Sequence, residues 1–416
     1  IDTNLTSNCA MDGGGIYFGG DANESRINNC IFTDNHAKYN GGAIDCNSSA
    51  MYLTNTTFDN NWAQYGAALC REVNAKGGHG ENNTFKNNHA YISGAALGWM
   101  GSVNITIIKY TFINNSADVS GGAIYVSPDS HNCSIINSTF ENNYVTNKTN
   151  NIANTFEWTA WNGDDMYYSV RLSTNSSLIG KTIQYVHSTL YYYENASSLD
   201  GILGVGGAVN ILAANATIKN SNFTDGAARL GGGIYVGANS GRTNITNSVF
   251  KANKADEKGG AVILLASAVH IEDSKFYDNE AVDGAALYVG GVGTENKVLK
   301  AIFDGNKATG YGGAIYWIAY AGVMDDINFT RNSAEYGGGI YFDGQSGNTN
   351  LTNVIFKLNN ATKNGGAIEC NASNIGIYNI TFESNYAGEY GAALCRETGA
   401  TRGHGFNNTF NYNYTT

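Results

Sequence analysis

The amino-acid sequence predicts an all-β protein, a single-stranded parallel β-helix of about thirteen rungs with one lateral insertion. The first observation is a recurring Phe that is followed three residues later by Asn in every copy except one, where Gly226 follows Phe223. The second is a Gly/Ala-rich step that recurs every 25 to 28 residues, with a single interval of 85. Fixed periods in this range indicate stacked, similar units. The Phe copies are Phe32, Phe58, Phe85, Phe112, Phe140, Phe223, Phe250, Phe276, Phe303, Phe329, Phe356, Phe382 and Phe410.

The apolar runs are short, β-branched or aromatic, and they are bounded by Asn, Gly, Ser and Asp, as in Gly-Gly-Ala-Ile-Tyr-Val at 121–126. Such runs are typical of strands between turns, whereas helical repeats need apolar residues at i, i+3, i+4 and i+7 over ten or more positions. A coil of about 26 residues therefore matches one rung of a parallel β-helix. Equivalent residues of successive rungs are then expected about 4.8 Å apart along the axis.

This stacking gives each recurring residue a structural role. The Phe column is expected to form an interior aromatic stack, with about 1.5–3 kcal/mol from the burial of each ring. The Asn three residues later tolerates left-handed backbone, and its amide can bond up and down the column. The Gly/Ala step permits a tight corner and a close approach of the next rung. The Gly steps begin at Gly13, Gly41, Gly66, Gly94, Gly121, Gly206, Gly231, Gly259, Gly284, Gly312, Gly337, Gly365 and Gly391.

One elongated domain is expected from the 416 residues, because each rung of a solenoid buries its face only against its neighbours. Residues 1–147 carry the first rungs, 148–205 form an aromatic-rich lateral insertion, and 206–416 continue the rungs. The first three rungs reappear about 324 residues later, nearly side chain for side chain. Two explanations stay open. In the first, the chain is a segment of a longer array of similar blocks. In the second, the end of one subunit resembles the start of the next because the subunits stack. Unpaired strand edges at the ends are a template for addition.

Composition restricts the possible partners and locations. The net charge of −11 with 14% charged residues argues against a nucleic-acid-binding face, which needs clustered Lys and Arg. No run of 18 apolar residues is present, so we expect no membrane span. The chain starts at Ile1 rather than Met, which predicts a processed form or an excised segment.

Six of the seven cysteines are predicted to form three disulfides, which would imply an oxidising, extracytoplasmic compartment. The two members of each of two pairs occupy the same place in successive Gly/Ala steps, so stacking would bring their sulfur atoms to disulfide range. The alternative is buried thiols. The predicted bonds join Cys46 to Cys70, Cys370 to Cys395, and Cys9 to Cys30, with Cys133 left over.

Many Asn-x-Ser/Thr sequons are compatible with the same compartment, as acceptors for N-linked glycan on a surface protein. Because a chain rich in Asn, Ser and Thr generates sequons by chance, each single site is a weak signal. The predicted sites are Asn4, Asn23, Asn47, Asn55, Asn104, Asn137, Asn147, Asn175, Asn195, Asn215, Asn244, Asn350, Asn371 and Asn379.

The sequence gives weak evidence for chemistry. Glycoside hydrolysis needs two carboxylates at a set separation, and the acidic residues are scattered, with Asp164-Asp165 beside Trp161 as the one acidic and aromatic cluster. No His/Cys spacing resembles a zinc site, so no metal or cofactor is predicted. We therefore expect a protein that is not an enzyme, with a polysaccharide-active lyase or hydrolase as the alternative.

The insertion is the predicted contact element, because exposed Trp and Tyr stack on sugar faces and dominate protein interfaces. The competing interpretation is that these aromatic residues form the insertion's own small core. The predicted contact residues are Trp158, Trp161, Tyr167, Tyr168 and Tyr192.

The pairing of Gly-Gly-Ala-Ile with Phe-x-x-Asn resembles the repeat of the chlamydial polymorphic outer-membrane proteins. It is still more similar to the Asn/Thr-rich adhesin-like surface proteins of methanogenic archaea, as in Ile136-Asn137-Ser138-Thr139-Phe140-Glu141-Asn142-Asn143. The resemblance covers nearly the whole chain outside 148–205 and implies a right-handed β-helix displayed on a cell surface. No translocating barrel and no anchor follow in this chain, and the paired cysteines are more regular than the family pattern requires.

These observations together predict an extracellular structural or adhesive surface protein. It is expected to assemble end to end into a filament or to form part of a longer array. The expected partners are other copies of the chain and cell-surface glycans or envelope components.

Overall fold

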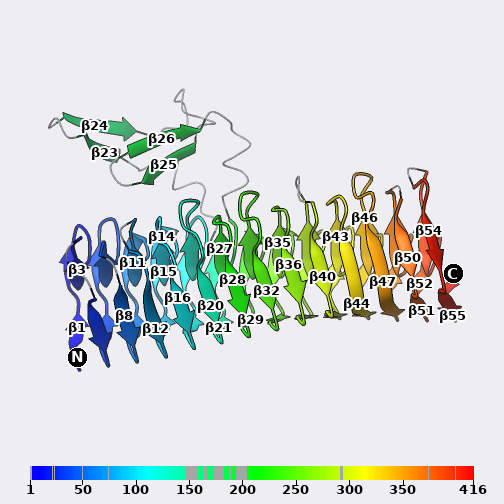
Figure 1. Ribbon diagram of the computed structural model, residues 1–416, viewed down its shortest axis with the longest axis horizontal. Coiled ribbons are helices and arrows are strands. Elements are labelled where there is room, and N and C mark those ends of the chain that lie inside the picture. The colour runs from blue at the N-terminus through cyan, green and yellow to red at the C-terminus, as the bar shows by residue number, and fades with distance from the viewer. Residues whose placement is uncertain are drawn as a thin grey trace.

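The computed structural model describes the body of the chain over residues 2–146 and 204–416, apart from 21, 23, 49, 74, 291–293, 373 and 399. It also describes four strands of the insertion. The body is a right-handed parallel β-solenoid of about thirteen turns (Figure 1). The predicted fold class is thus confirmed. The predicted segment boundaries at 147/148 and 205/206 fall at or beside residues outside the described ranges and stay predictions.

Each rung contributes strands to three parallel sheets, which we call sheets A, B and C. In a typical rung, β8 (Met51–Thr54) and β9 (Thr57–Asp59) lie in sheet A, β10 (Trp62–Tyr65) in sheet B and β11 (Leu69–Arg71) in sheet C. Sheet A has 25 described strands, sheet B has 14 and sheet C has 13. The strands are only two to eight residues long because turn residues follow each short apolar run.

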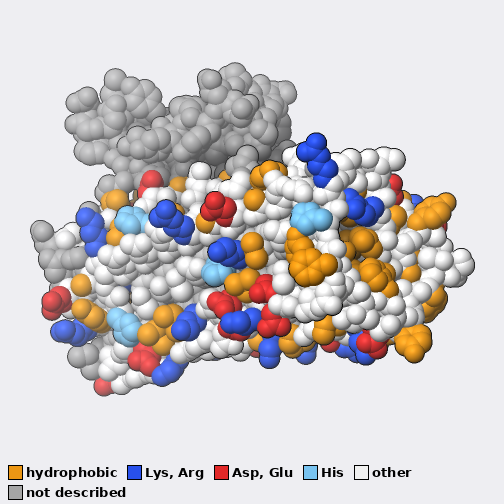
Figure 2. Space-filling view, turned by 45° about the vertical axis from the view of Figure 1, so that its right-hand side comes forward, with side chains coloured by type: hydrophobic (Ala, Val, Ile, Leu, Met, Phe, Trp, Pro, Cys, Tyr) orange, Lys and Arg blue, Asp and Glu red, His pale blue; other side chains and the backbone are white. Residues whose placement is uncertain are grey.

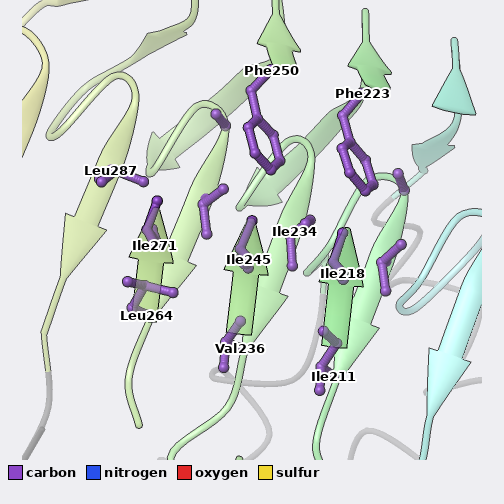
Figure 3. Packing of buried hydrophobic residues seen from close by; sticks show 14 of the residues in the cluster. Ile211, Ile218, Phe223, Ile234, Val236, Ile245, Phe250, Leu264, Ile271 and Leu287 are labelled. Carbon is purple, nitrogen blue, oxygen red and sulfur yellow. The ribbon is translucent and has the colours of Figure 1, made fainter. Parts of the chain in front are cut away.

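The rungs are stacked in register, so that each Phe pairs with the Phe of the next rung. Phe58 of β9 pairs with Phe32 and with Phe85, and Phe140 pairs with Phe223 across the insertion. The thirteen rings form one stack with centroids 4.5–5.3 Å apart. Columns of Ile, Val and Leu complete the core, as Figure 3 shows for the rungs of Phe223 and Phe250. The predicted aromatic column is confirmed.

The Asn three residues after Phe forms a buried hydrogen-bonded ladder. The amide nitrogen of Asn61 donates to the Phe32 carbonyl and to Asn88 Oδ1, both at 3.0 Å. Its backbone N–H donates to the same Asn88 oxygen at 3.0 Å. Every donor and acceptor of such an amide therefore has a partner, which is what a buried polar side chain requires. At the one exception, the backbone N–H of Gly226 still donates to Asn253 Oδ1.

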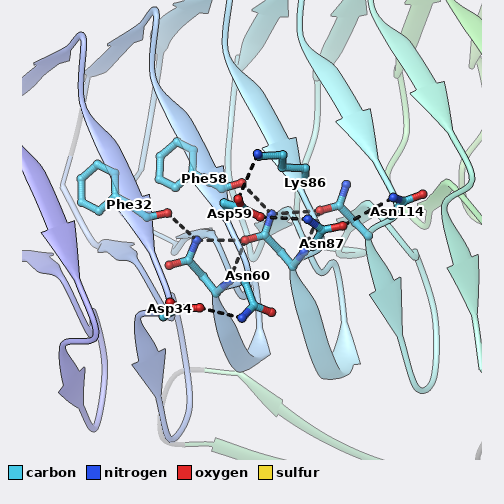
Figure 4. Close-up of polar contacts among 11 residues, drawn as sticks. Phe32, Asp34, Phe58, Asp59, Asn60, Lys86, Asn87 and Asn114 are labelled. Carbon is cyan, nitrogen blue, oxygen red and sulfur yellow. Dashed lines mark hydrogen bonds and ion pairs between the residues drawn. The ribbon is translucent and has the colours of Figure 1, made fainter.

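The left-handed residue of this turn is not the predicted one. Positive φ angles belong to the residue two after Phe, for example 55° at Asn60 and 56° at Asn87, and not to the Asn at the third position. The exposed side chains at the second position form an outer ladder, in which Asn60 donates to Asp34 and Asn114 to Asn87 (Figure 4). The prediction for the corner is confirmed, because all thirteen step glycines have φ between 52° and 67°.

The surface carries charges of both signs. Lys and Arg lie beside Asp and Glu over the face that Figure 2 shows. Several are paired between neighbouring rungs, such as Lys300 with Glu272 at 2.8 Å and Arg331 with Asp304 at 2.7 Å. Such exposed pairs contribute little to stability, about 0–1 kcal/mol each. The described part of the chain contains no helix with the length and hydropathy that a bilayer crossing requires.

The prediction of three disulfides is wrong in this structure, because none of the seven cysteines forms one. Cys70 pairs in register with Asp45, whereas Cys46 pairs with Arg71. Successive side chains of a strand point to opposite faces, so an offset of one residue separates the two sulfur atoms.

The same offset and a difference of sheet explain the other two pairs. Cys395 pairs with Glu369 and Cys370 with Arg396. Cys9 belongs to β2 (Cys9–Ala10) of sheet B, whereas Cys30 is buried between β4 (Arg26–Asn28) and β5 (Ile31–Thr33) of sheet A.

Replacing Asn332 by Ala is expected to destabilise the protein by about 3 kcal/mol, because buried donors and acceptors on both neighbouring rungs lose a partner. Asn332 bonds to the Phe303 carbonyl and to Asn359, and it accepts from Asn306. Asn328→Ala is the matched control, since Asn328 is exposed in the same rung. Urea unfolding monitors both variants, and equal midpoints would contradict a structural role for the ladder.

A thiol titration tests the corrected cysteine state. Purified protein, denatured without reductant, is expected to react with a thiol reagent at all seven cysteines. Three disulfides would leave one reactive thiol. A count near one after purification under air would restore the original prediction.

Candidate functional site

The first residue of the short sheet-B strands points outward, because the residue that follows it is in most rungs a buried Ala or Val. Ala37, Ala63, Ala90 and Ala117 make an interior cluster beneath these strands. The outward column therefore accepts any side chain without disturbing the coil. Over five consecutive rungs it holds Trp62, His89, Ser116, Tyr144 and Ala227.

These residues belong to five strands of sheet B. The strands are β10, β14 (His89–Ser93), β18 (Ser116–Ala117), β22 (Tyr144–Val145) and β30 (Ala227–Leu230). The last two are the sheet-B strands on either side of the insertion in the chain.

An open trough of about 600 Å³ runs along this column. We call it the lateral groove. Aromatic rings stand at Trp62 and Tyr144, and small side chains at Ser116 and Ala227 leave space between and beyond them. Its other side is the outer ladder, whose left-handed turns hold exposed amide side chains at the rim. The lining residues are Trp62, Asn87, His89, Asn114, Ser116, Asn142, Tyr144, Asp225 and Ala227.

One end of the groove is an aromatic cluster. The Trp62 and His89 rings meet edge to face with centroids 5.3 Å apart, and His89 meets Tyr91 in the same way at 5.3 Å. Trp62 and Tyr91 are 37% and 38% exposed, so each offers a ring surface to solvent. The indole N–H of Trp62 donates to Asn60 Oδ1 at 3.3 Å. The cluster thus offers rigid aromatic ring faces to solvent beside a row of side-chain amides.

His89 is held from behind by polar groups. Its Nδ1 lies 2.8 Å from Ser116 Oγ, and its Nε2 lies 3.8 Å from Asp118 Oδ1. Burial, followed by the charge of Asp118, raises the pKa of the Tyr91 hydroxyl, which stays a neutral donor at physiological pH. Asp118 is itself 9% exposed and accepts from Thr146 at 2.6 Å. It therefore orients the cluster rather than facing the groove.

The arrangement is suited to binding neutral, hydroxyl-rich molecules. Aromatic faces pack against apolar C–H surfaces, and amides both donate and accept hydrogen bonds. Among the described lining residues, one carboxylate, Asp225, is present.

The predicted contact residues of the insertion lie in four strands that form two antiparallel hairpins. Strand β23 (Glu157–Asn162) pairs with β24 (Met166–Arg171), and β25 (Thr182–Val186) pairs with β26 (Thr189–Tyr193). In the first hairpin Trp161 is opposite Tyr167. The side chains of Trp158, Trp161, Tyr167, Tyr168 and Tyr192, and the whole of Asp164 and Asp165, lie outside the described residues. Their predicted contact role stays a prediction.

The predicted sequons differ in accessibility. Asn23, Asn147, Asn175 and Asn195 lie outside the described residues, and Asn47, Asn244 and Asn371 are half-buried. The exposed acceptors are Asn4, Asn55, Asn104, Asn137, Asn215, Asn350 and Asn379. Occupancy of these sites stays a prediction.

Sequence reasoning missed the lateral groove, although a signal was present. The residue four after Phe is followed by Ala or Val in the rungs of Phe58, Phe85, Phe112 and Phe140. Most rungs carry a polar residue at that place, and Trp62 and Tyr144 are exposed aromatic residues there.

Comparison with known proteins supports the fold and the repeat type. The model for a right-handed β-helix region matches residues 122–317. The model for the Chlamydia polymorphic membrane protein repeat matches residues 29–47, 109–127 and 326–343.

Two curated relatives share about a third of their aligned residues with this chain. A metabotropic glutamate receptor-like protein R of Dictyostelium discoideum is 32% identical over 43% of the chain, and a probable outer membrane protein pmp6 of Chlamydia pneumoniae is 31% identical over 28%. The chain spans only 11% and 10% of their lengths.

Solved structures that align with most of this chain have low sequence identity to it. A tailspike protein of E. coli bacteriophage HK620 matches 98% of this chain and 60% of its own, with 10% identity and a TM-score of 0.43. The Agl-KA catalytic domain matches 96% of this chain and 62% of its own, with 11% identity and a TM-score of 0.37.

Together, the two family models and the in-register stacking of the rungs identify the chain as a parallel β-helix protein with repeats like those of the chlamydial polymorphic membrane proteins.

Proposed function

We propose that this chain is part of an extracellular surface protein and that its lateral groove binds glycan chains. The observation that carries the proposal is the line of exposed aromatic rings and amides along sheet B. The similarity to a probable outer membrane protein supports a location at the cell surface. A rigid solenoid suits such a location, because it extends away from its attachment without needing a separate core.

The dimensions of the groove favour an extended ligand. Trp62 and Tyr144 are three rungs apart, which corresponds to about 14 Å along the axis. This separation suits the length of a short oligosaccharide lying parallel to the rod. Sugar rings would stack on Trp62 and Tyr144, and their hydroxyl groups would bond to Asn87, Asn114 and Asn142. The groove is open along its length, so a chain longer than the groove can still bind.

Binding without cleavage is the version of the proposal that the lining supports. Hydrolysis needs an acid and a second carboxylate flanking the glycosidic bond. Among the described lining residues Asp225 supplies one carboxylate, and Asp118 is turned toward His89 and Thr146. A polysaccharide-active enzyme therefore remains the alternative.

Two finer parts of the proposal rest on the sequence. The aromatic insertion is proposed as a second contact element, and the resemblance to the adhesin-like proteins of methanogenic archaea stays a prediction about origin. The return of the first three rungs about 324 residues later supports an assembly of similar units, either within a longer array or between subunits.

Replacing Trp62 or Tyr144 by Ala is expected to weaken glycan binding roughly tenfold or more, the effect of losing one stacking contact of about 1.5 kcal/mol. A glycan array identifies a ligand for the wild-type protein, and calorimetry measures its affinity for each variant. Tyr390→Ala is the matched control, because Tyr390 is 65% exposed and does not line the groove.

Two further variants separate the alternatives. Loss of binding in Trp161→Ala but not in Trp62→Ala would place the ligand on the insertion and contradict the groove. Release of reducing ends from the ligand, abolished in Asp225→Asn, would make the protein an enzyme.

Assembly is tested by imaging the purified chain. Negative-stain micrographs are expected to show rods joined end to end, and their length should grow with protein concentration. Single rods at all concentrations would contradict self-assembly by this chain.

A further inference from the structure

The middle residue of each sheet-C strand forms an outward column that is mostly aromatic or aliphatic. Tyr125, Tyr235, Ile263 and Tyr288 are typical members. Two pairs of consecutive rungs differ, because they place a carboxylate directly beside a cysteine. These pairs are Asp45 with Cys70 and Glu369 with Cys395.

The C-terminal pair belongs to a cluster of three ligand-type side chains. Glu369 lies in β49 (Ile368–Cys370), Cys395 lies in β53 (Leu394–Arg396), and Glu397 follows that strand. One carboxylate oxygen of each glutamate and the Cys395 sulfur lie within 4.8 Å of one another. The Cys395 sulfur is 3.9 Å from Glu397 Oε1. Small side-chain rotations can bring three such atoms to one ion, at about 2.0–2.3 Å from its centre.

The strongest indication of a ligand is the buried carboxylate. Glu369 is 2% exposed, and its Oε2 has no hydrogen-bond partner. In the N-terminal cluster Asp45 is 1% exposed, and both of its carboxylate oxygens lack a partner. Buried carboxylate oxygens without partners are costly, and such groups are normally paired, bound to metal or protonated. A bound cation would give these oxygens a partner in each cluster.

The two copies share their polar surroundings and the residue types of their ligands, and among the described residues only the C-terminal copy has its three ligand atoms within 4.8 Å of one another. Asn40 donates to Glu72 Oε1 at 2.9 Å in the N-terminal copy, and Asn364 donates to Glu397 Oε1 at 3.4 Å in the C-terminal copy. The backbone N–H of Glu72 donates to the Cys46 carbonyl at 3.0 Å, and that of Glu397 donates to the Cys370 carbonyl at 2.9 Å. In each copy the glutamate after the cysteine, Glu72 or Glu397, is thus held by two hydrogen bonds, one to its carboxylate and one from its backbone N–H.

The next rung packs closely against the N-terminal sulfur. Gly98 follows Cys70 in the column, and a Cβ atom at Gly98 would lie 3.6 Å from the Cys70 sulfur and 3.0 Å from the Gly66 nitrogen. Gly98 is therefore the residue that this close approach of the Gly66 backbone requires.

We propose that each cluster is a binding site for one zinc-class divalent cation, held by Asp45, Cys70 and Glu72 in the first copy and by Glu369, Cys395 and Glu397 in the second. One thiolate with two carboxylates selects a borderline-soft ion over Ca²⁺ or Mg²⁺, which prefer oxygen ligands alone. Binding converts the cysteine thiol to a thiolate and releases its proton to solvent. The ion would join two consecutive rungs, as the disulfides were predicted to do.

Cobalt is the probe, because a thiolate bound to Co²⁺ gives a sulfur-to-metal charge-transfer band in the near ultraviolet. The full chain, reduced and stripped with a chelator, is titrated with Co²⁺ and then with Zn²⁺, which displaces cobalt. The wild-type protein is expected to bind two equivalents with the sulfur band. Cys70→Ser and Cys395→Ser should each bind one equivalent with that band, and the double variant none.

Three further variants separate ligation from folding. Cys133→Ser is the matched control, since Cys133 is a buried thiol outside both clusters, and it should keep two equivalents. Glu369→Gln keeps the size of the side chain and should abolish binding at one site while the circular dichroism spectrum stays unchanged. Asn364→Ala removes only the group that orients Glu397 and should weaken that site about 10- to 100-fold.

The proposal is overturned if the wild-type protein shows no sulfur band, or if the band persists in the double cysteine variant. Binding of cobalt without the band would show a carboxylate site that does not use the cysteines, which also contradicts it. The outcome is independent of the glycan proposal, because Trp62→Ala should leave both equivalents in place.

Discussion

The in-register stacking of consecutive rungs is the constraint on which the rest of this structure depends. A side chain that bonds to its own kind can propagate along the whole rod, and Asn is suited to this because its amide both donates and accepts. In the buried ladder each Asn bonds to the rung before and to the rung after, as Asn61 does with Phe32 and Asn88. The aromatic stack follows the same register, so the polar and apolar columns reinforce one another.

The fold could be predicted because its information lies in spacing, which the sequence shows directly. The Phe column and the Gly corners were located by counting, and the register places them where the period requires. The fine geometry could not be predicted in this way. Asn60 and Asn61 are the same residue type, so the sequence cannot tell the left-handed exposed one from the buried one. The offset that puts Cys70 beside Asp45 is one residue, which is smaller than the variation between repeats.

The candidate sites share one physical reason for having been hard to predict. Inward columns must be filled by similar residues, whereas outward columns carry no such requirement and can vary from rung to rung. Trp62 and Tyr144 are outward positions of sheet B, and Asp45 and Glu369 are outward positions of sheet C. A periodic pattern indicates what is structural, so the residues that depart from it at outward positions are those to examine for function.

The single gap in the Asn ladder shows how the rod accommodates the insertion. Gly226 belongs to the first full rung after the insertion, and a Cβ atom there would lie 2.4 Å from the Gly232 carbonyl oxygen. An Asn at this position would therefore clash before it could bond. The backbone N–H of Gly226 keeps the bond that the backbone of each Asn rung also makes, and the Phe140–Phe223 stack continues at 4.6 Å. Because the strand pairs Ile124–Val209, Ile135–Ile218 and Phe140–Phe223 and the aromatic stack continue where the Asn ladder is interrupted, they keep the register across the insertion without it.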